Sequence, residues 1–235
     1  MAWEQVIGQE RVQLMLQRAI VRDRVPQSLL LTGEDGAGTL AIAIAFARVV
    51  NCEQPVVSGD RIDACGTCHA CKQNHSLQHP NVRFVISYPS GKAETDDELP
   101  KEVVEELKEA IQTVAADPYV PFQLTNATQI RIGQIRDLKR SLALSSAQNG
   151  RRVVIIHHAD EMKVESANAF LKTLEEPHEN VTLILTTAHP ERLLQTIVSR
   201  CQEVVVPPLD DDQIISALVS GGWCTHDEAV LLAPF

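Results

Sequence analysis

The chain has 235 residues, of which 44% are hydrophobic, and its formal net charge at pH 7 is −10. This size allows one large domain with a core, or one domain and part of a second. The acidic balance argues against a surface that is wholly a nucleic-acid footprint, because such surfaces are usually basic. Neither a membrane-length apolar run nor a secretory leader is recognisable, so we expect a soluble, cytoplasmic protein whose six cysteines are thiols or metal ligands.

The first elements alternate between helix and strand. Apolar residues at helical spacing predict a helix over 8–23, and the short apolar run 28–32 predicts a buried strand. A second helix is expected over 39–50. Strand, glycine-rich loop and helix follow one another in the order that a phosphate-binding loop requires.

That loop has the outline of a Walker A motif and lacks its reactive side chains. A working motif ends in Lys and Ser or Thr, which hold the β/γ-phosphates and Mg²⁺. Here Thr39 and Leu40 stand at those two positions, and neither can replace an ammonium or a metal-binding hydroxyl. We therefore expect no nucleotide hydrolysis and no bound nucleotide at this degenerate loop, whose remaining positions are Gly33, Gly36 and Gly38.

The segment 51–79 carries a metal-type cysteine pattern. Two overlapping C-x-x-C units preceded by a fourth cysteine are typical of tetrahedral thiolate zinc sites. Buried free thiols or an iron–sulfur cluster are the competing interpretations. We expect a closed structural zinc site, with His69, His75 and His79 as ordinary surface residues and Cys201 and Cys224 as apolar packing. The predicted ligands are Cys52, Cys65, Cys68 and Cys71.

The rest of the chain continues the alternation. Strands are predicted over 81–87, 152–157, 181–186 and 203–206, with a polar loop over 89–100 and irregular chain over 117–131. Helices are predicted over 101–116, from Ile132, between Val164 and Pro177, and from near Asp210 after a Pro207–Pro208 hinge. Apolar strands alternating with helices indicate an α/β fold with a mostly parallel sheet covered on both faces.

The strand that should supply the acidic Walker B residues ends in His157 and His158 instead. Imidazole is a poor ligand for Mg²⁺, which prefers oxygen. We interpret the two histidines as a structural pair. Asp160 and Glu161 lie beyond the expected strand end, and we expect them to cap the following turn and helix. Both halves of the hydrolytic apparatus are thus impaired together.

Several stretches carry a family resemblance over nearly the whole chain. They are IGQERVQLMLQRAI, LLLTGEDGAG, the NC…CGTCHAC cluster, ANAFLKTLEEPHENVTLILTTAHPERLLQTIVSRC and VVVPPL. In these the chain resembles the clamp-loader subunits of bacterial DNA polymerase III, within the AAA+ group. Among them it is most similar to the delta-prime type, because the gamma/tau motor subunits keep the loop lysine and an acidic strand end.

The resemblance implies a non-hydrolysing stator in a hetero-pentameric ring with gamma/tau and delta subunits, which loads a sliding clamp on primer–template DNA. It also implies that Arg200, within Ser199-Arg200-Cys201, is an arginine finger for the neighbouring motor subunit's ATP site. A planar cation there would stabilise the charge that develops on the transferring phosphate. From position alone, Arg200 would be a solvated helix end.

The resemblance also sets the expected domain organisation. An AAA+ core of three α/β/α layers is expected over 1–207, with the zinc module near 51–79 and an acidic, partly helical insert near 88–129. A truncated helical lid would follow over 208–235, without the family's collar domain. The apolar last residues suggest a chain cut from something longer.

Two other functions remain open. One is an ATPase of the gamma/tau type that uses an atypical loop, since backbone N–H groups at a helix start can still attract an anion. The other is a zinc-bearing adaptor or nucleic-acid-binding module unrelated to replication. Basic residues that would contact DNA, or simply form a solvated face, are Arg131, Arg136, Lys139, Arg140, Arg151 and Arg152.

Overall fold

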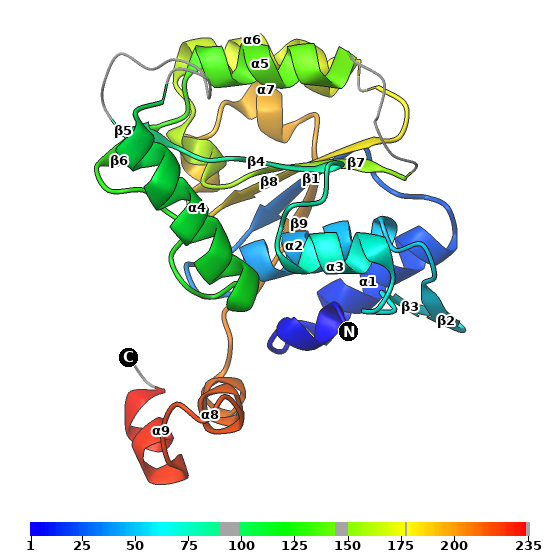
Figure 1. Cartoon of the computed structure of the whole chain (residues 1–235), viewed down its shortest axis with the longest axis vertical. Coiled ribbons are helices and arrows are strands. Elements are labelled where there is room, and N and C mark those ends of the chain that lie inside the picture. The colour runs from blue at the N-terminus through cyan, green and yellow to red at the C-terminus, as the bar shows by residue number, and fades with distance from the viewer. Residues whose placement is uncertain (90–98, 144–149, 177, 234–235) are drawn as a thin grey trace.

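The computed structural model describes residues 1–89, 99–143, 150–176 and 178–233. Within these residues, five strands form a parallel sheet in the order β4-β7-β8-β1-β9 (Figure 1). Because all five run the same way, their carboxyl ends share one edge of the sheet. The strands are β1 Ser28–Thr32, β4 Val82–Val85, β7 Arg152–Ile156, β8 Val181–Thr187 and β9 Gln202–Val205.

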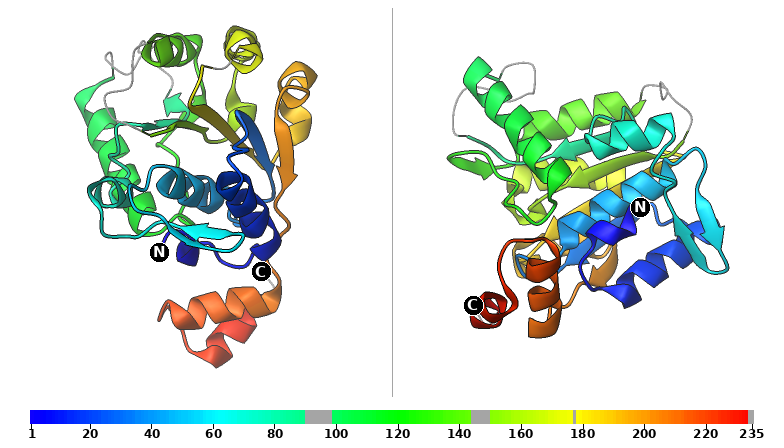
Figure 2. Two further views of the ribbon diagram at one scale, coloured as in Figure 1. Left: turned by 90° about the vertical axis from the view of Figure 1, so that its right-hand side faces the viewer. Right: turned by 60° about the horizontal axis from the view of Figure 1, so that its bottom comes forward.

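Helices cover both faces of this sheet. One face packs against α1 (Glu10–Val21), α2 (Thr39–Val50) and the cysteine-bearing segment, in a core that also includes the 3-10 turn η1 (Trp3–Gln5). The other face packs against α5 (Ile132–Ala143), α6 (Val164–Glu175) and the short α7 (Gln195–Val198). Figure 2 shows the sheet between these two layers. The expected three-layer α/β/α fold with a parallel sheet is confirmed.

The cysteine segment contains elements that we did not predict. Strands β2 (Val56–Ser58) and β3 (Arg61–Asp63) form an antiparallel hairpin, and α3 (His69–His75) follows. Trp3 donates its indole N–H to the Ile62 carbonyl at 2.9 Å, which ties the hairpin to the start of the chain. The segment is thus a packed module rather than a bare metal-binding loop.

The insert also has more structure than expected. Helix α4 (Lys101–Ala116) has the predicted bounds, whereas the stretch predicted to be irregular includes β6 (Ala127–Gln129). This strand pairs antiparallel with β5 (Tyr88–Pro89). Much of the polar loop predicted over 89–100 lies outside the described residues.

The second half of the core includes two short 3-10 turns, η3 (Ala159–Glu161) after β7 and η4 (Pro190–Arg192) after β8. Beyond β9 the chain forms α8 (Asp211–Ser220), whose capping box is built on Asp210 as the predicted helix start requires. A further helix, α9 (His226–Leu232), was missed by the sequence analysis. In Figure 1 these two helices lie below the core and are joined to it by an extended segment. None of the helices in the described ranges has the length and apolar character needed to cross a membrane.

Candidate functional site: a glycine-rich loop, a cysteine cluster and an arginine before β9

The loop after β1 keeps the backbone shape of a phosphate-binding loop. Gly36 and Gly38 have φ of 86° and 95°, in the left-handed region that glycine adopts without a steric penalty. At Gly33, an added Cβ would lie 2.5 Å from the Val206 carbonyl oxygen. Helix α2 then begins at Thr39, and Leu40 is only 5% exposed because it packs into the core. The position that binds metal in a working loop therefore holds a buried apolar side chain.

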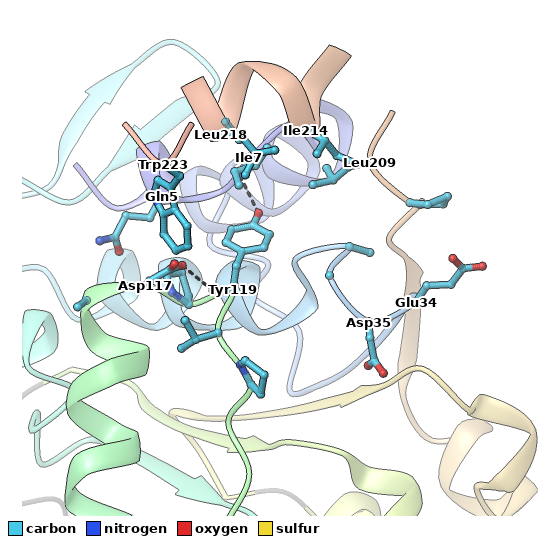
Figure 3. A pocket seen from close by; sticks show the side chains of 18 residues that line it. Gln5, Ile7, Glu34, Asp35, Asp117, Tyr119, Leu209, Ile214, Leu218 and Trp223 are labelled. Carbon is cyan, nitrogen blue, oxygen red and sulfur yellow. Dashed lines mark hydrogen bonds between the residues drawn. The ribbon is translucent and has the colours of Figure 1, made fainter. Parts of the chain in front are cut away.

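Tyr119, from the insert, covers this loop. Its hydroxyl accepts a hydrogen bond from the Ile7 backbone N–H at 2.7 Å, and an added Cβ at Gly38 would lie 2.7 Å from the same oxygen (Figure 3). Burial raises the pKa of Tyr119 to about 12, so the phenol stays protonated. Sequence reasoning missed this residue, since only the packing of the insert on the core brings it to the loop.

Two cavities adjoin Tyr119. The larger, of about 880 Å³, lies between the loop, the chain start, the insert and α8, and Trp223 and Leu218 contribute to its apolar wall (Figure 3). The smaller, of about 290 Å³, lies between Gly38, Thr39 and the histidines that end β7. Neither cavity has a lysine or arginine among its described lining residues. The larger is also lined by Glu34, Asp35 and Asp117, which disfavour a phosphate there.

The two histidines that follow β7 lie in contact with each other and with the core. His157 and His158 have ring centroids 3.9 Å apart, and His157 stacks on Phe122 at 5.9 Å. Its Nδ1 lies 2.8 Å from Thr186 Oγ1. Burial, with a smaller effect of His158, lowers the pKa of His157 to about 3, which keeps this imidazole neutral. It therefore supplies neither a cation for phosphate nor an oxygen for Mg²⁺.

The expectation that Asp160 and Glu161 cap the next helix was wrong. Asp160 accepts a hydrogen bond from Thr187 Oγ1 at 2.5 Å, and Glu161 accepts one from the Ser87 hydroxyl. No side chain caps α6 at Lys163. The two carboxylates instead accept hydrogen bonds from hydroxyl groups at the carboxyl end of β8 and just beyond that of β4.

Arg200 lies at the amino-terminal ends of the parallel strands, whereas the loop lies at their carboxyl ends. It comes two residues before β9, whose far end is fixed beside the loop by a hydrogen bond of 2.7 Å from Val206 N to the Thr32 carbonyl. The four steps from Gln202 to Val206 span about 13 Å of extended chain. The guanidinium is held by Glu175 Oε1 at 2.6 Å and by the Thr196 carbonyl at 2.9 Å. Arg200 is thus held at the end of β9 that lies away from its own chain's glycine-rich loop.

The predicted metal ligands converge. The four Sγ atoms of Cys52, Cys65, Cys68 and Cys71 all lie within 4.8 Å of one another. Sulfur–sulfur distances of 3.5, 3.9 and 4.0 Å are close to the roughly 3.8 Å edge of a tetrahedron with Zn–S bonds of about 2.3 Å. The set therefore fits one tetrahedral ion.

Backbone N–H groups support the thiolate form of these ligands. Cys65 N donates to Cys52 Sγ at 3.2 Å, and the N–H groups of Cys68 and Cys71 donate to the preceding cysteine sulfurs at 3.4 Å. Hydrogen bonds from the Thr67 and Cys68 backbones lower the pKa of Cys65 to about 6. Burial raises the pKa of Cys52 and Cys71, a cost that a bound cation would offset.

The histidines near the cluster behave differently from one another. His69 and His75 are exposed as predicted, whereas His79 is 2% exposed and was wrongly placed on the surface. Its Nδ1 accepts a hydrogen bond from Asn81 N at 3.2 Å, and burial lowers its pKa. Cys201 is partly buried against the α6–α7 side of the core, and burial raises its pKa to about 11.

Most of the basic residues considered for DNA contact have partners within the protein. Arg152 donates to the carbonyls of Ser141 and Leu142 at the end of α5, at 3.1 and 2.7 Å. The side chains of Arg131, Lys139 and Arg151 also donate to backbone carbonyls, and Arg140 pairs with Asp137. These contacts explain the basic residues as supports of local structure.

Comparisons with known proteins agree on one family. A family model described as "DNA polymerase III, delta subunit" matches residues 8–210. The DNA polymerase III subunit delta' of Bacillus subtilis is 28% identical over 218 residues, which cover 93% of this chain and 53% of that protein. The delta' subunit of Pseudomonas aeruginosa is 33% identical over 178 residues, covering 76% and 42%. The tau subunit of Escherichia coli is 28% identical over 209 residues, covering 89% and 26%.

A solved structure shares the fold. The gamma subunit-related protein of Thermotoga maritima superimposes with a TM-score of 0.52 at 22% identity, over 94% of this chain and 58% of that one. The chain thus spans about half the length of the delta' relatives named above.

Proposed function

The chain belongs to the DNA polymerase III delta subunit family, and from that membership we propose that it is a non-hydrolysing, delta'-type component of a clamp loader. In this proposal it is a cytoplasmic stator that joins gamma/tau motor subunits and a delta subunit in a hetero-pentameric ring. The ring would load a sliding clamp on primer–template DNA. Residues 1–207 would form the AAA+ core and 208–235 the first part of a lid, with further domains as in the longer relatives.

The observation that carries the proposal is the separation of Arg200 from its own phosphate loop. The loop follows the carboxyl end of β1, and Arg200 precedes the amino-terminal end of the neighbouring strand β9. Because the loop and Arg200 lie on opposite sides of the subunit, this arrangement suits head-to-tail assembly, in which each interface joins two different surfaces. Arg200 would then reach the ATP of the neighbouring motor subunit and stabilise the charge that develops during phosphoryl transfer.

The loop supports the other half of the proposal. Thr39 and buried Leu40 replace the Lys and hydroxyl residues, Tyr119 covers Gly38, and neutral His157 stands at the end of β7. Each change removes a group that phosphoryl transfer needs, or takes up its space. We propose that the isolated chain does not turn over ATP.

Structural zinc belongs to the same proposal. Cys52, Cys65, Cys68 and Cys71 would hold Zn²⁺ in a closed, four-thiolate site. The ion would connect the chain after α2 to the start of α3. It would stabilise the module and take no part in the chemistry.

The deciding experiment compares Arg200→Ala with the unaltered protein in the ring reconstituted from complete subunits. DNA-stimulated ATP turnover should fall at least about tenfold, because removing an arginine finger costs far more than that in other NTPases. Arg22→Ala is the matched control, since Arg22 is also exposed and pairs with a carboxylate, that of Asp60. Unchanged turnover for Arg200→Ala in an assembled ring would remove the finger from the proposal.

A gamma/tau-type ATPase is the second candidate, and it is favoured by similar identity to tau subunits, 27% in Bacillus subtilis and 28% in Escherichia coli. Phosphate release from the isolated chain with ATP and Mg²⁺ distinguishes the two. Turnover above that of a blank would establish the ATPase and refute the stator.

A further inference from the structure

Glu175 is the last residue of α6 and lies beside Arg200 at the edge of the sheet. A carboxylate in the last turn of a helix faces the negative end of the helix dipole, which is an unfavourable position without a nearby cation. Arg200 supplies that cation from the segment after α7, 25 residues along the chain. The Glu175–Arg200 ion pair therefore forms because α6 and α7 pack together. The two residues are not neighbours three or four positions apart on one helix.

The guanidinium is fixed from two directions. Nη2 donates to Glu175 Oε1 at 2.6 Å, and Nη1 donates to the Thr196 carbonyl at 2.9 Å. The carboxylate belongs to α6 and the carbonyl to α7, so the guanidinium plane is set by both helices. Arg has five N–H donors, and these two bonds leave three for another acceptor. The Arg200 side chain retains 34% of its exposure, so an anion outside the chain can reach it.

We propose that Glu175 is a positioning residue for Arg200, holding the guanidinium in the orientation in which it meets an anionic phosphate of a neighbouring subunit. This rests on the proposed role of Arg200 as a finger. A long arginine side chain loses rotamer freedom when it is fixed on a ligand. Glu175 removes part of that freedom before the subunits meet, so less is lost when the transition state forms.

The experiment uses the complete protein in the reconstituted ring and measures kcat and KM for ATP with primed DNA. Glu175→Ala should lower kcat by about three- to tenfold with little change in KM, because the cation remains and only its orientation is lost. Glu175→Gln, which keeps an oxygen acceptor without the charge, should fall between this variant and the unaltered protein. Glu176→Gln is the matched control, because it makes the same charge change one residue further along, at an exposed carboxylate.

The double variant separates positioning from general damage. If Glu175 acts through Arg200, Glu175→Ala combined with Arg200→Ala should turn over no more slowly than Arg200→Ala alone. Thermal unfolding of the single variants checks that the fold is retained. An additive loss in the double variant, or a Glu175→Ala ring that is as fast as or faster than the unaltered one, overturns the positioning role. An Arg200→Ala ring with normal turnover overturns the finger itself, so the two failures are distinguishable.

Discussion

The two ends of α2 differ in how complete the side-chain set of each candidate site is. At its start, the loop from Gly33 to Gly38 keeps the backbone of a phosphate site, while Thr39 and Leu40 replace the side chains that do the chemistry. Just past its end, Cys52 begins a set of four thiols that is complete and convergent. A recognisable backbone is therefore not by itself evidence of activity, because phosphate transfer also depends on a few side chains at fixed positions of the loop.

The largest effect on stability should come from removing one thiol of the four-cysteine cluster. Cys68→Ser leaves three thiolates, so the bound metal should be lost to a mild chelator and the free energy of unfolding should fall. The free energy of unfolding should fall by about 4 kcal/mol if the free zinc concentration is 1,000 times the dissociation constant of zinc from the unaltered protein. Metal content after chelation and urea unfolding in the presence of zinc would check this. Cys224→Ser, outside the cluster, should behave like the unaltered chain, and an equal loss in that variant would contradict the site.

Arg48, near the carboxyl end of α2, contacts both α3 and the start of the chain, and it tests how much this end of the helix contributes to stability. It is 7% exposed, its Nε donates to the Asn74 carbonyl at 3.3 Å, and it also donates to the Gln5 side chain. Arg48→Met should leave both acceptors unsatisfied and lower the free energy of unfolding by about 1–3 kcal/mol. Arg11→Met, at an exposed position of α1, should change it by less than about 0.5 kcal/mol. Similar losses in the two variants would show that the buried contacts of Arg48 contribute little.

His157, which lines the cavity beside the loop, should make the stability of the fold depend on pH. Its pKa is lowered from 6.5 to about 3 in the folded chain, so below pH 6.5 the unfolded chain binds the extra proton and the folded chain does not. Stability from this group is complete above pH 6.5 and is lost as the pH falls toward 3. Between pH 7 and pH 5 the loss should be about 2 kcal/mol. His157→Gln should reduce this pH dependence in urea unfolding, while His226→Gln, at an exposed histidine, should not.

The smallest effect should come from repairing the loop. Thr39→Lys with Leu40→Thr restores both side chains but leaves Tyr119 above Gly38. Adding Tyr119→Ala should tighten Mg-ADP binding at least about tenfold, or 1.4 kcal/mol, relative to the double variant. Isothermal titration calorimetry measures the difference. Equal affinities would mean that Tyr119 does not limit access to the loop.

Much of the fold follows from sequence patterns, and the local elements show why. The helices predicted over 39–50 and 101–116 match α2 and α4 residue for residue, because glycine or proline marks their starts. The hairpin of β2 and β3 was missed because strands of three residues are too short to show alternation. The convergence of the four cysteines could be predicted because the spacing of a metal-type cysteine pattern is local.

The missed features of the site come from contacts between distant segments. Tyr119 meets Ile7 across 112 residues, and Glu175 meets Arg200 across 25. His79 is buried in the folded chain, which the sequence pattern around it does not predict. Periodicity and motif spacing report local geometry, whereas these contacts depend on how whole layers pack.

Strand β9 has one further consequence. Arg200 precedes it by two residues, and at its other end Pro207 and Pro208 precede the start of α8. The strand is hydrogen-bonded along β1, so it acts as a short rigid rod rather than a flexible tether. Because β9 is held to β1 along its length, the segment that carries Arg200 and the segment that leads to α8 are both fixed to the same sheet, one at each end of the strand.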